Sequence, residues 1–179
     1  MRPLLKYLIL ALLAGMLFLA QLSLALLPNV ELVSLLIMSI ACSFKLKDGI
    51  LVIILFTLLE GLYWGFADWV LGYLWIWSLL VILVQVTLPL TQLKANRMAI
   101  LGGLFGLAFG FFFALQHALL YGLSMGISYW IMGIGFDLLH GFANYTLILL
   151  LFEPINKNLT HLIRKAENRY GNRHYENGR

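Results

Sequence analysis

The chain has 179 residues, of which 62% are hydrophobic and only 11% are charged. So much apolar sequence exceeds what a soluble globular domain of this length needs, and the composition therefore predicts a polytopic membrane protein. The single cysteine, Cys42, excludes an internal disulfide, and no Cys and His cluster has metal-finger spacing, so a metal or redox role has no support. We expect an all-α protein whose helices form one bundle in a lipid bilayer.

A bilayer core of about 30 Å requires roughly 20 apolar residues in each crossing helix. Six segments approach this length: residues 4–27, 29–44, 50–67, 69–90, 98–121 and 127–152. The second segment is short and the sixth is long, so we expect tilt, or a helix break at Gly133 and Gly135. Residues 1–155 are thus predicted to form a six-helix transmembrane domain, and residues 156–179 a basic cytoplasmic tail.

The basic residues predict the orientation of these helices. With the N-terminus in the cytoplasm, all twelve Lys and Arg residues fall on the cytoplasmic side. They are Arg2, Lys6, Lys45, Lys47, Lys94, Arg97, Lys157, Arg164, Lys165, Arg169, Arg173 and Arg179. The links at 27–29, 66–69 and 121–126 carry none, as the positive-inside rule requires. We therefore expect both termini in the cytoplasm, and we attribute the net charge of +4 to topology rather than to a nucleic acid partner.

Both ends of the chain leave an alternative open. Arg2 and Lys6 precede an apolar run that ends at Ser23, which also fits a cleaved signal peptide. The run is longer than the usual apolar region of a signal peptide, which favours a first transmembrane helix. The tail has apolar residues at helical spacing, so it fits either an interfacial helix on anionic lipid or a solvated segment.

Six ionisable side chains lie within the spans or on the outer side, where no Lys or Arg is expected beside them: Glu31, Glu60, Asp68, His117, Asp137 and His140. A carboxylate at the middle of a bilayer costs about 2.5 to 3.5 kcal/mol on insertion scales. Each carboxylate therefore requires either a structural partner or a function.

The sixth segment carries a polar stripe. With about 3.6 residues per turn, Trp130, Gly133, Asp137, His140 and Asn144 share one face of the helix. An aromatic ring, a small residue and three hydrogen-bonding groups on one face are typical of a helix that lines a ligand cavity. In the alternative hypothesis, Asp137 and His140 bond to each other, at positions i and i+3, and only hold helices together.

Two other segments offer candidate binding residues. In the fifth, the glycine ladder Gly102, Gly106 and Gly110 predicts close helix packing, while His117 either contacts substrate or is structural. In the third, Glu60 and Trp64 lie on one face. An aromatic ring there can stack on a flat ligand while the carboxylate binds its amine.

An intramembrane enzyme is one hypothesis for the function. Phe113 to His117 is an F-x-x-x-H pattern and His140 to Asn144 an H-x-x-x-N pattern, and both resemble motifs of CAAX-type membrane proteases. That family also requires an E-E-x-x-x-R motif to activate water. Here Glu60 stands alone and no arginine lies in any span, so the protease remains the alternative hypothesis.

Three segments resemble a different family, the S components of energy-coupling factor (ECF) vitamin transporters. They are LPNVELVSLLIMSIACSF at 27–44, LLEGLYWGFADWVLGYLWIWSLLV at 58–81 and GIGFDLLHGFANYTLILLLFEPI at 133–155. The resemblance implies a bacterial plasma-membrane subunit that binds a water-soluble vitamin or precursor from outside. It also implies a transmembrane coupling subunit and two ATP-binding subunits as partners. This chain has no Walker A motif, so it is expected to be neither an enzyme nor dependent on a cofactor.

The resemblance also implies roles for particular residues. The family's A-x-x-x-A coupling motif corresponds here to Ala11 and Gly15, small residues that let a coupling helix approach. The expected substrate-binding residues are Glu60, Trp64, His117, Trp130, Asp137, His140 and Asn144. A cavity with these residues and no Lys or Arg favours a neutral or amine-bearing heterocycle over a phosphate or polycarboxylate. Aminopyrimidine, pyridoxine-like and cobalamin-like ligands all remain open.

Overall fold

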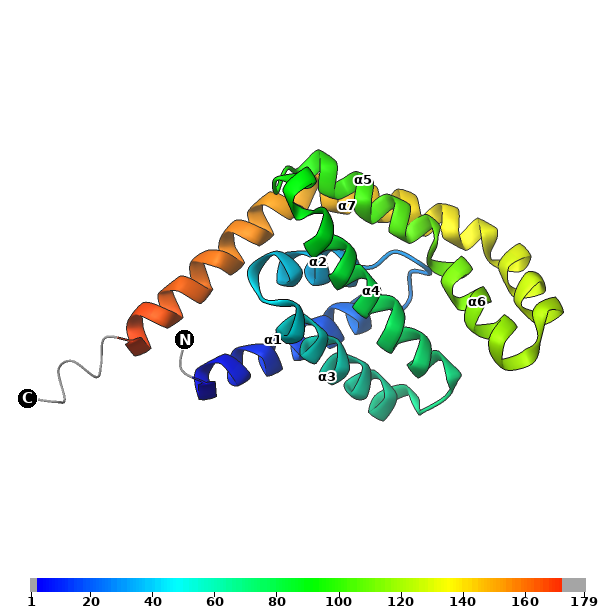
Figure 1. Cartoon of the computed structure of the whole chain (residues 1–179), viewed down its shortest axis with the longest axis horizontal. Coiled ribbons are helices and arrows are strands. Elements are labelled where there is room, and N and C mark those ends of the chain that lie inside the picture. Colours follow the sequence, from blue (N-terminus) through cyan, green and yellow to red (C-terminus); the bar gives the residue numbers. More distant parts are fainter. Residues whose placement is uncertain (1–2, 172–179) are drawn as a thin grey trace, which may run out of the picture.

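A computed structural model describes residues 3–171 of the chain (Figure 1). The helices are α1 (Pro3–Ser23), α2 (Val33–Ser43), α3 (Leu46–Trp64), α4 (Asp68–Thr91), α5 (Ala95–Leu107), α6 (Phe109–Tyr121) and α7 (Leu123–Gly171). The described residues contain no strand, which confirms the all-α prediction.

Four of the described stretches are long and apolar enough to cross a membrane: Pro3–Ser23, Asp68–Thr91, Ala95–Tyr121 and Leu123–Ala166. The third of these comprises α5 and α6 together. The apolar helix α2 is shorter, and α3 includes the charged residues Lys47, Asp48 and Glu60. Each of the six predicted spans nevertheless lies mostly on helical structure, although residues 24–27 and 29–32 are not helical.

The position of the helix break differs from the sequence prediction. Helix α7 runs without interruption through Gly133 and Gly135, so the predicted break there is wrong. A Cβ added at either glycine would meet nothing within 4 Å, so no neighbouring residue presses on the helix at these two positions. Glycine lowers helix propensity by about 1 kcal/mol but does not by itself end a helix. The break instead lies in the fifth predicted span, at Ala108 (φ −92°, ψ −3°).

The predicted tail is an extension of the last span. Helix α7 continues through Pro154 to Gly171, so residues 156–171 are helical and continuous with the segment before them. Residues 172–179, including Arg173 and Arg179, lie outside the described part of the chain.

The helices place alternate links at opposite ends of the molecule. In Figure 1 the start of α1, the α2–α3 and α4–α5 links and the end of α7 lie toward the left, whereas the α3–α4 and α6–α7 links lie toward the right. The left-hand segments carry the Lys and Arg residues whose side chains are described, and we call this side the basic end. The arrangement agrees with the predicted separation of basic and non-basic links.

Helix α2 is the centre of the core. Its residues from Val33 to Ala41 are all buried, and it packs against α4 and α7. Helix α1 contributes Leu10, Ala14 and Leu17 to the same core. This packing makes the first helix part of the bundle.

The predicted glycine ladder brings α5 onto α7. A Cβ at Gly106 would lie 2.9 Å from the backbone oxygen of His140 and 3.0 Å from the Cα of Gly141. Any larger residue would push the two backbones apart, so the prediction of close packing is confirmed. The contact fixes the polar stripe of α7 beside the break between α5 and α6.

Candidate ligand cavity

The break at Ala108 provides a partner for Asp137. A helix start leaves backbone N–H groups without intrahelical acceptors. In the first turn of α6, the N–H of Gly110 donates to Asp137 Oδ1 at 2.8 Å. A Cβ at Gly110 would lie 2.5 Å from both carboxylate oxygens, so this contact requires glycine. The second oxygen, Asp137 Oδ2, is buried without a hydrogen-bond partner among the described residues.

His140 has a separate partner. Its Nε2 lies 3.1 Å from Oε1 of Glu31, which belongs to the link between α1 and α2. The other oxygen of Glu31 accepts the backbone N–H of Ser34 at 2.8 Å, so the same carboxylate caps the start of α2. Because Asp137 and His140 bond to different groups, the hypothesis that they satisfy each other is wrong.

One turn further along α7, Asn144 completes the stripe. Its side-chain amide donates to the hydroxyl of Ser34 at 2.9 Å, and only 1% of the residue is exposed. His140 therefore attaches α7 to the α1–α2 link, and Asn144 attaches it to the first turn of α2. These bonds hold the link between α1 and α2 against the stripe.

Two adjoining cavities lie beside these groups. The larger has a volume of about 590 Å³ and is bordered by α4, α6 and α7, including Trp69, Phe113 and Asp137. The smaller, of about 150 Å³, lies under the α1–α2 link and includes Glu31 and His140 in its wall. Asn29, Tyr73 and Phe109 line both cavities. The combined space is within the range of roughly 300 to 1,000 Å³ typical of small-molecule sites.

The cavity walls contain unused hydrogen-bonding atoms. Asp137 Oδ2, His140 Nδ1 and Trp77 Nε1 are buried and have no partner among the described residues. A buried polar atom without a partner costs about 1 to 3 kcal/mol. A ligand that bonds to these atoms would remove that cost. The walls contain no Lys or Arg in the part of the chain that the structure describes.

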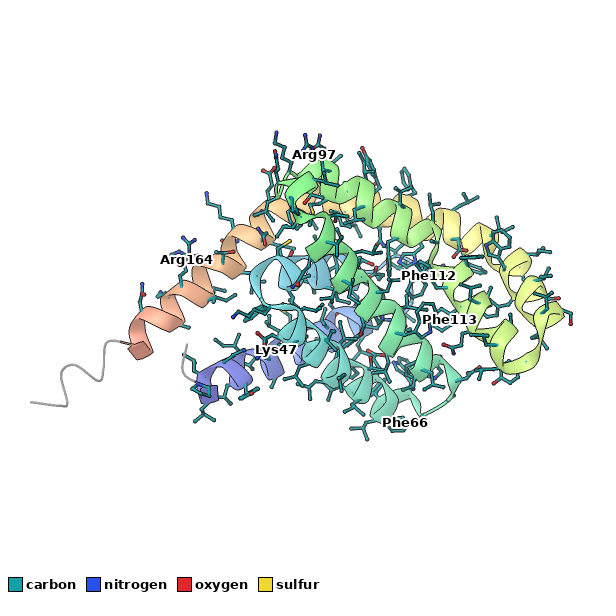
Figure 2. All side chains as sticks on the ribbon, viewed as in Figure 1. Lys47, Phe66, Arg97, Phe112, Phe113 and Arg164 are labelled. Carbon is teal, nitrogen blue, oxygen red and sulfur yellow. The ribbon has the colours of Figure 1, made fainter. Side chains whose placement is uncertain are left out.

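Aromatic rings form the remaining surface. Phe109 meets His140 edge-on at a centroid distance of 4.8 Å, and Tyr73 meets Trp69 at 5.2 Å and Phe113 at 6.3 Å. Figure 2 shows Phe113 in the part of the molecule opposite Lys47 and Arg164. The cavities therefore combine ring faces with a few polar atoms, and they lie away from the basic end.

Asn144 and the other predicted binding residues do not line either cavity. Trp64 is 55% exposed at the end of α3, and Trp130 is 43% exposed against Phe111. Glu60 is buried on α3, with Oε1 lacking a partner among the described residues. The structure thus brings together Asp137, His140 and Asn144. It places Glu60, Trp64 and Trp130 elsewhere.

His117 lies one layer behind the larger cavity. Its ring stacks on Tyr129 at 4.2 Å, and Tyr129 itself borders the cavity. His117 Nδ1 is 2.9 Å from the backbone oxygen of Phe113, and Nε2 is 3.8 Å from Asp68 Oδ2. The two histidines of the protease-like patterns therefore lie beside different carboxylates.

The predicted coupling residues lie on an open face of α1. Ala11 is exposed, and a Cβ added at Gly15 would meet nothing within 4 Å. Leu8, Leu12 and Leu19 are also exposed on this helix, at 55%, 74% and 60%. This surface has room for another helix.

Sequence reasoning missed several cavity residues: Gln21, Asn29, Glu31, Tyr73, Trp77 and Phe109. The predicted link was confined to residues 27–29, whereas residues 24–32 form an irregular link in which Asn29 has φ +56°. The turn signal of Pro28 followed by Asn29 marks the position of this link but not its length.

Comparisons of this chain with protein-family models, curated proteins and solved structures found no match. Among the described residues, no group of three or more His, Cys, Asp or Glu side chains is arranged to hold a metal ion. The described residues around the cavities offer a ligand hydrogen bonds and ring stacking.

Proposed function

We propose that this protein is the substrate-binding S component of an ECF-type importer, which captures a water-soluble vitamin or vitamin precursor. The observation that carries the proposal is the pair of cavities beside Asp137 and His140, with free polar atoms in an aromatic enclosure. The sequence resemblance to ECF S components supports the same assignment.

The charge distribution supports the direction of capture. If the basic end faces the cytoplasm, as the positive-inside rule requires, six helical spans place both termini inside. The cavities then face the outside of a bacterial plasma membrane. The α1–α2 link and the α3–α4 link lie on that side and border or flank the entrance.

The polar atoms without partners indicate which hydrogen bonds a ligand would make. Asp137 Oδ2 accepts a hydrogen bond, and Trp77 Nε1 only donates one. With Nε2 of His140 directed at Glu31, Nδ1 is the ring nitrogen left for a ligand. A flat ring with amino groups and a ring nitrogen meets these demands and stacks on Tyr73 or Phe109. A neutral or amine-bearing heterocycle of aminopyrimidine or pyridoxine size is favoured over a corrin, which exceeds the available volume.

The proposed roles follow from position. Asp137 and His140 contact the ligand, and Asn144 positions α7 through Ser34. Glu60, Trp64, His117 and Trp130 are not assigned direct contacts. Ala11 and Gly15 receive the coupling subunit, and two partner ATPases supply the energy of transport.

The test is ligand binding to the purified full-length protein. A panel of radiolabelled water-soluble vitamins and precursors should include one that binds, and Asp137→Asn should weaken its binding about ten- to a hundredfold. Asp68→Asn is the matched control, because Asp68 lies outside both cavities, and it should retain affinity. Absence of binding across the panel, with peptide cleavage that His117→Ala and His140→Ala abolish, would favour the protease instead.

A further inference from the structure

A separate cavity of about 560 Å³ lies at the basic end, far from the proposed substrate site in the fold. It is enclosed by α1, the α2–α3 link, the α4–α5 link and the polar part of α7. Lys6, Lys45, Lys47 and Arg164 line it, against one carboxylate, Asp48. We call this cavity the basic cleft. Figure 2 shows Lys47 and Arg164 on the same side of the molecule.

The single carboxylate is already engaged. Asp48 Oδ1 lies 2.7 Å from Lys6 Nζ, and the carboxylate side chain is only 8% exposed. Lys45, Lys47 and Arg164 are exposed at the rim and form no ion pair with another described residue. The cleft therefore has a net positive charge directed at its opening.

Lysines gather at the start of α3. Lys45 is the N-cap residue, with no side-chain capping bond, and Lys47 is in the first turn beside Asp48, whose carboxylate is engaged with Lys6. Backbone N–H groups and the helix dipole make a helix N-terminus favourable for anions. An anion bound between Lys45 and Lys47 would relieve their mutual repulsion.

The apolar wall of the cleft and its position along α7 indicate which kind of anion fits it. Phe44, Leu93 and Ile163 give it an apolar side, and 42% of Leu93 is exposed. Helix α7 changes from apolar to polar sequence after Phe152. Asn156, Thr160 and Arg164 then follow one turn apart on the cleft side. When a helix crosses a bilayer, such a change from apolar to polar sequence lies at the depth of the lipid headgroups.

We propose that the basic cleft binds the headgroup of an anionic phospholipid. The phosphate lies between Lys45, Lys47 and Arg164, and the first part of an acyl chain lies on Leu93 and Ile163. Asn156 Oδ1 is buried without a partner among the described residues, and it accepts a hydrogen bond from a headgroup hydroxyl. A glycerol headgroup, as in phosphatidylglycerol, supplies both the phosphate and that hydroxyl. The site is independent of the proposed transport function.

The experiment uses the full-length protein in neutral detergent, titrated with phosphatidylglycerol or phosphatidylcholine and examined by native mass spectrometry. The double variant Lys47→Gln/Arg164→Gln removes two cleft cations, and Lys94→Gln/Lys165→Gln removes two cations at the same end that do not line the cleft. The cleft variant should bind phosphatidylglycerol about tenfold to thirtyfold more weakly, and the control should match the parent protein. Phosphatidylcholine should not bind at the same concentrations.

A further variant tests the headgroup contact. Asn156→Ala should weaken binding of phosphatidylglycerol and leave binding of phosphatidic acid, which lacks the glycerol hydroxyl, unchanged. Equal losses in the two double variants would show general surface attraction and overturn the site. Equal binding of phosphatidylcholine would also overturn it, as would displacement of the lipid by inorganic phosphate or by an acidic peptide at comparable concentration.

Discussion

Asp48 and Asp137 are buried equally, each 6% exposed, at opposite ends of the bundle, but their partners differ. Asp48 has a cation, Lys6, at 2.7 Å. Asp137 has one backbone N–H on one oxygen and no described partner on the other. The first carboxylate is used to join α1 to α3. The second joins α6 to α7 and keeps hydrogen-bonding capacity for a ligand.

Two glycine-containing helix faces also differ, because one is in contact with a neighbouring helix and the other is open. Where α5 meets α7, backbones approach so closely that Gly106 has no room for a Cβ. On α1, Gly15 faces open space. Glycine permits a contact already made in the first case, and in the second it leaves a surface available for a partner. Substitutions at matched positions can test whether each end and each face has the role assigned to it.

The largest effect is expected at Gly106. The branched side chain of Gly106→Val must displace the backbone of His140 and Gly141, so the free energy of unfolding should fall by about 3 kcal/mol or more. Chemical denaturation of the purified protein in detergent measures this change. Gly135→Val, on the open face of α7, is the control and should stay close to the parent protein. Equal unfolding midpoints for the two variants would contradict the close packing of α5 and α7.

The ion pair at the basic end should give the next largest effect. Asp48→Asn leaves the Lys6 ammonium, which is three-quarters buried, without its counter-charge, and should cost about 2 to 3 kcal/mol. Adding Lys6→Gln removes the unpaired charge, and the double variant should recover most of the loss. If the two single losses simply add in the double variant, the pair is not coupled. Ligand affinity at the opposite end should be unchanged throughout.

Asp137 should give a smaller loss of stability that depends on the replacement. Asp137→Ala leaves the N–H of Gly110 without an acceptor and should cost about 1 to 2 kcal/mol. Asp137→Asn keeps an oxygen for that N–H and should retain nearly the stability of the parent protein. Thermal unfolding without ligand compares the two variants. An equal loss in both would show that the negative charge itself stabilises the fold, and would weaken the case for a ligand-binding role.

Sequence periodicity was sufficient for features that lie on one helix. The stripe from Asp137 to Asn144 and the ladder through Gly106 need only the helical repeat, and both lie where expected. The partner of His140 could not be found this way, because Glu31 is 109 positions away in the chain and depends on how the α1–α2 link folds back. The spacing also cannot say which face of a helix meets a neighbour. Trp64 and Trp130 were therefore assigned to a cavity although they are largely exposed.

The helix break is the clearest case of a feature decided by tertiary packing. Glycine content pointed to Gly133 and Gly135, whereas the chain bends at Ala108, although alanine is the strongest helix former. At Ala108 the freed N–H of Gly110 gains the Asp137 carboxylate from another helix. Helix α7 continues through Gly133 and Gly135.

The smallest losses of stability are expected on the open face of α1, where we predict that Ala11→Leu changes the free energy of unfolding by less than about 0.5 kcal/mol and that Gly15→Leu raises it by no more than about 1 kcal/mol. Nothing lies within 4 Å of a Cβ at Gly15, so a larger side chain enters free space, and leucine is a better helix former than glycine. Ligand affinity should also be unchanged, because neither Ala11 nor Gly15 lines either cavity. Uptake by cells that also contain the coupling subunit and ATPases should nevertheless be lost, since added bulk keeps a partner helix at a distance. Leu12→Ala, which makes the same face smaller, is the control and should retain uptake. If uptake persists in Gly15→Leu at normal protein levels, this face of α1 is not the coupling surface, whereas a parallel loss of ligand binding would place Gly15 in the substrate site instead.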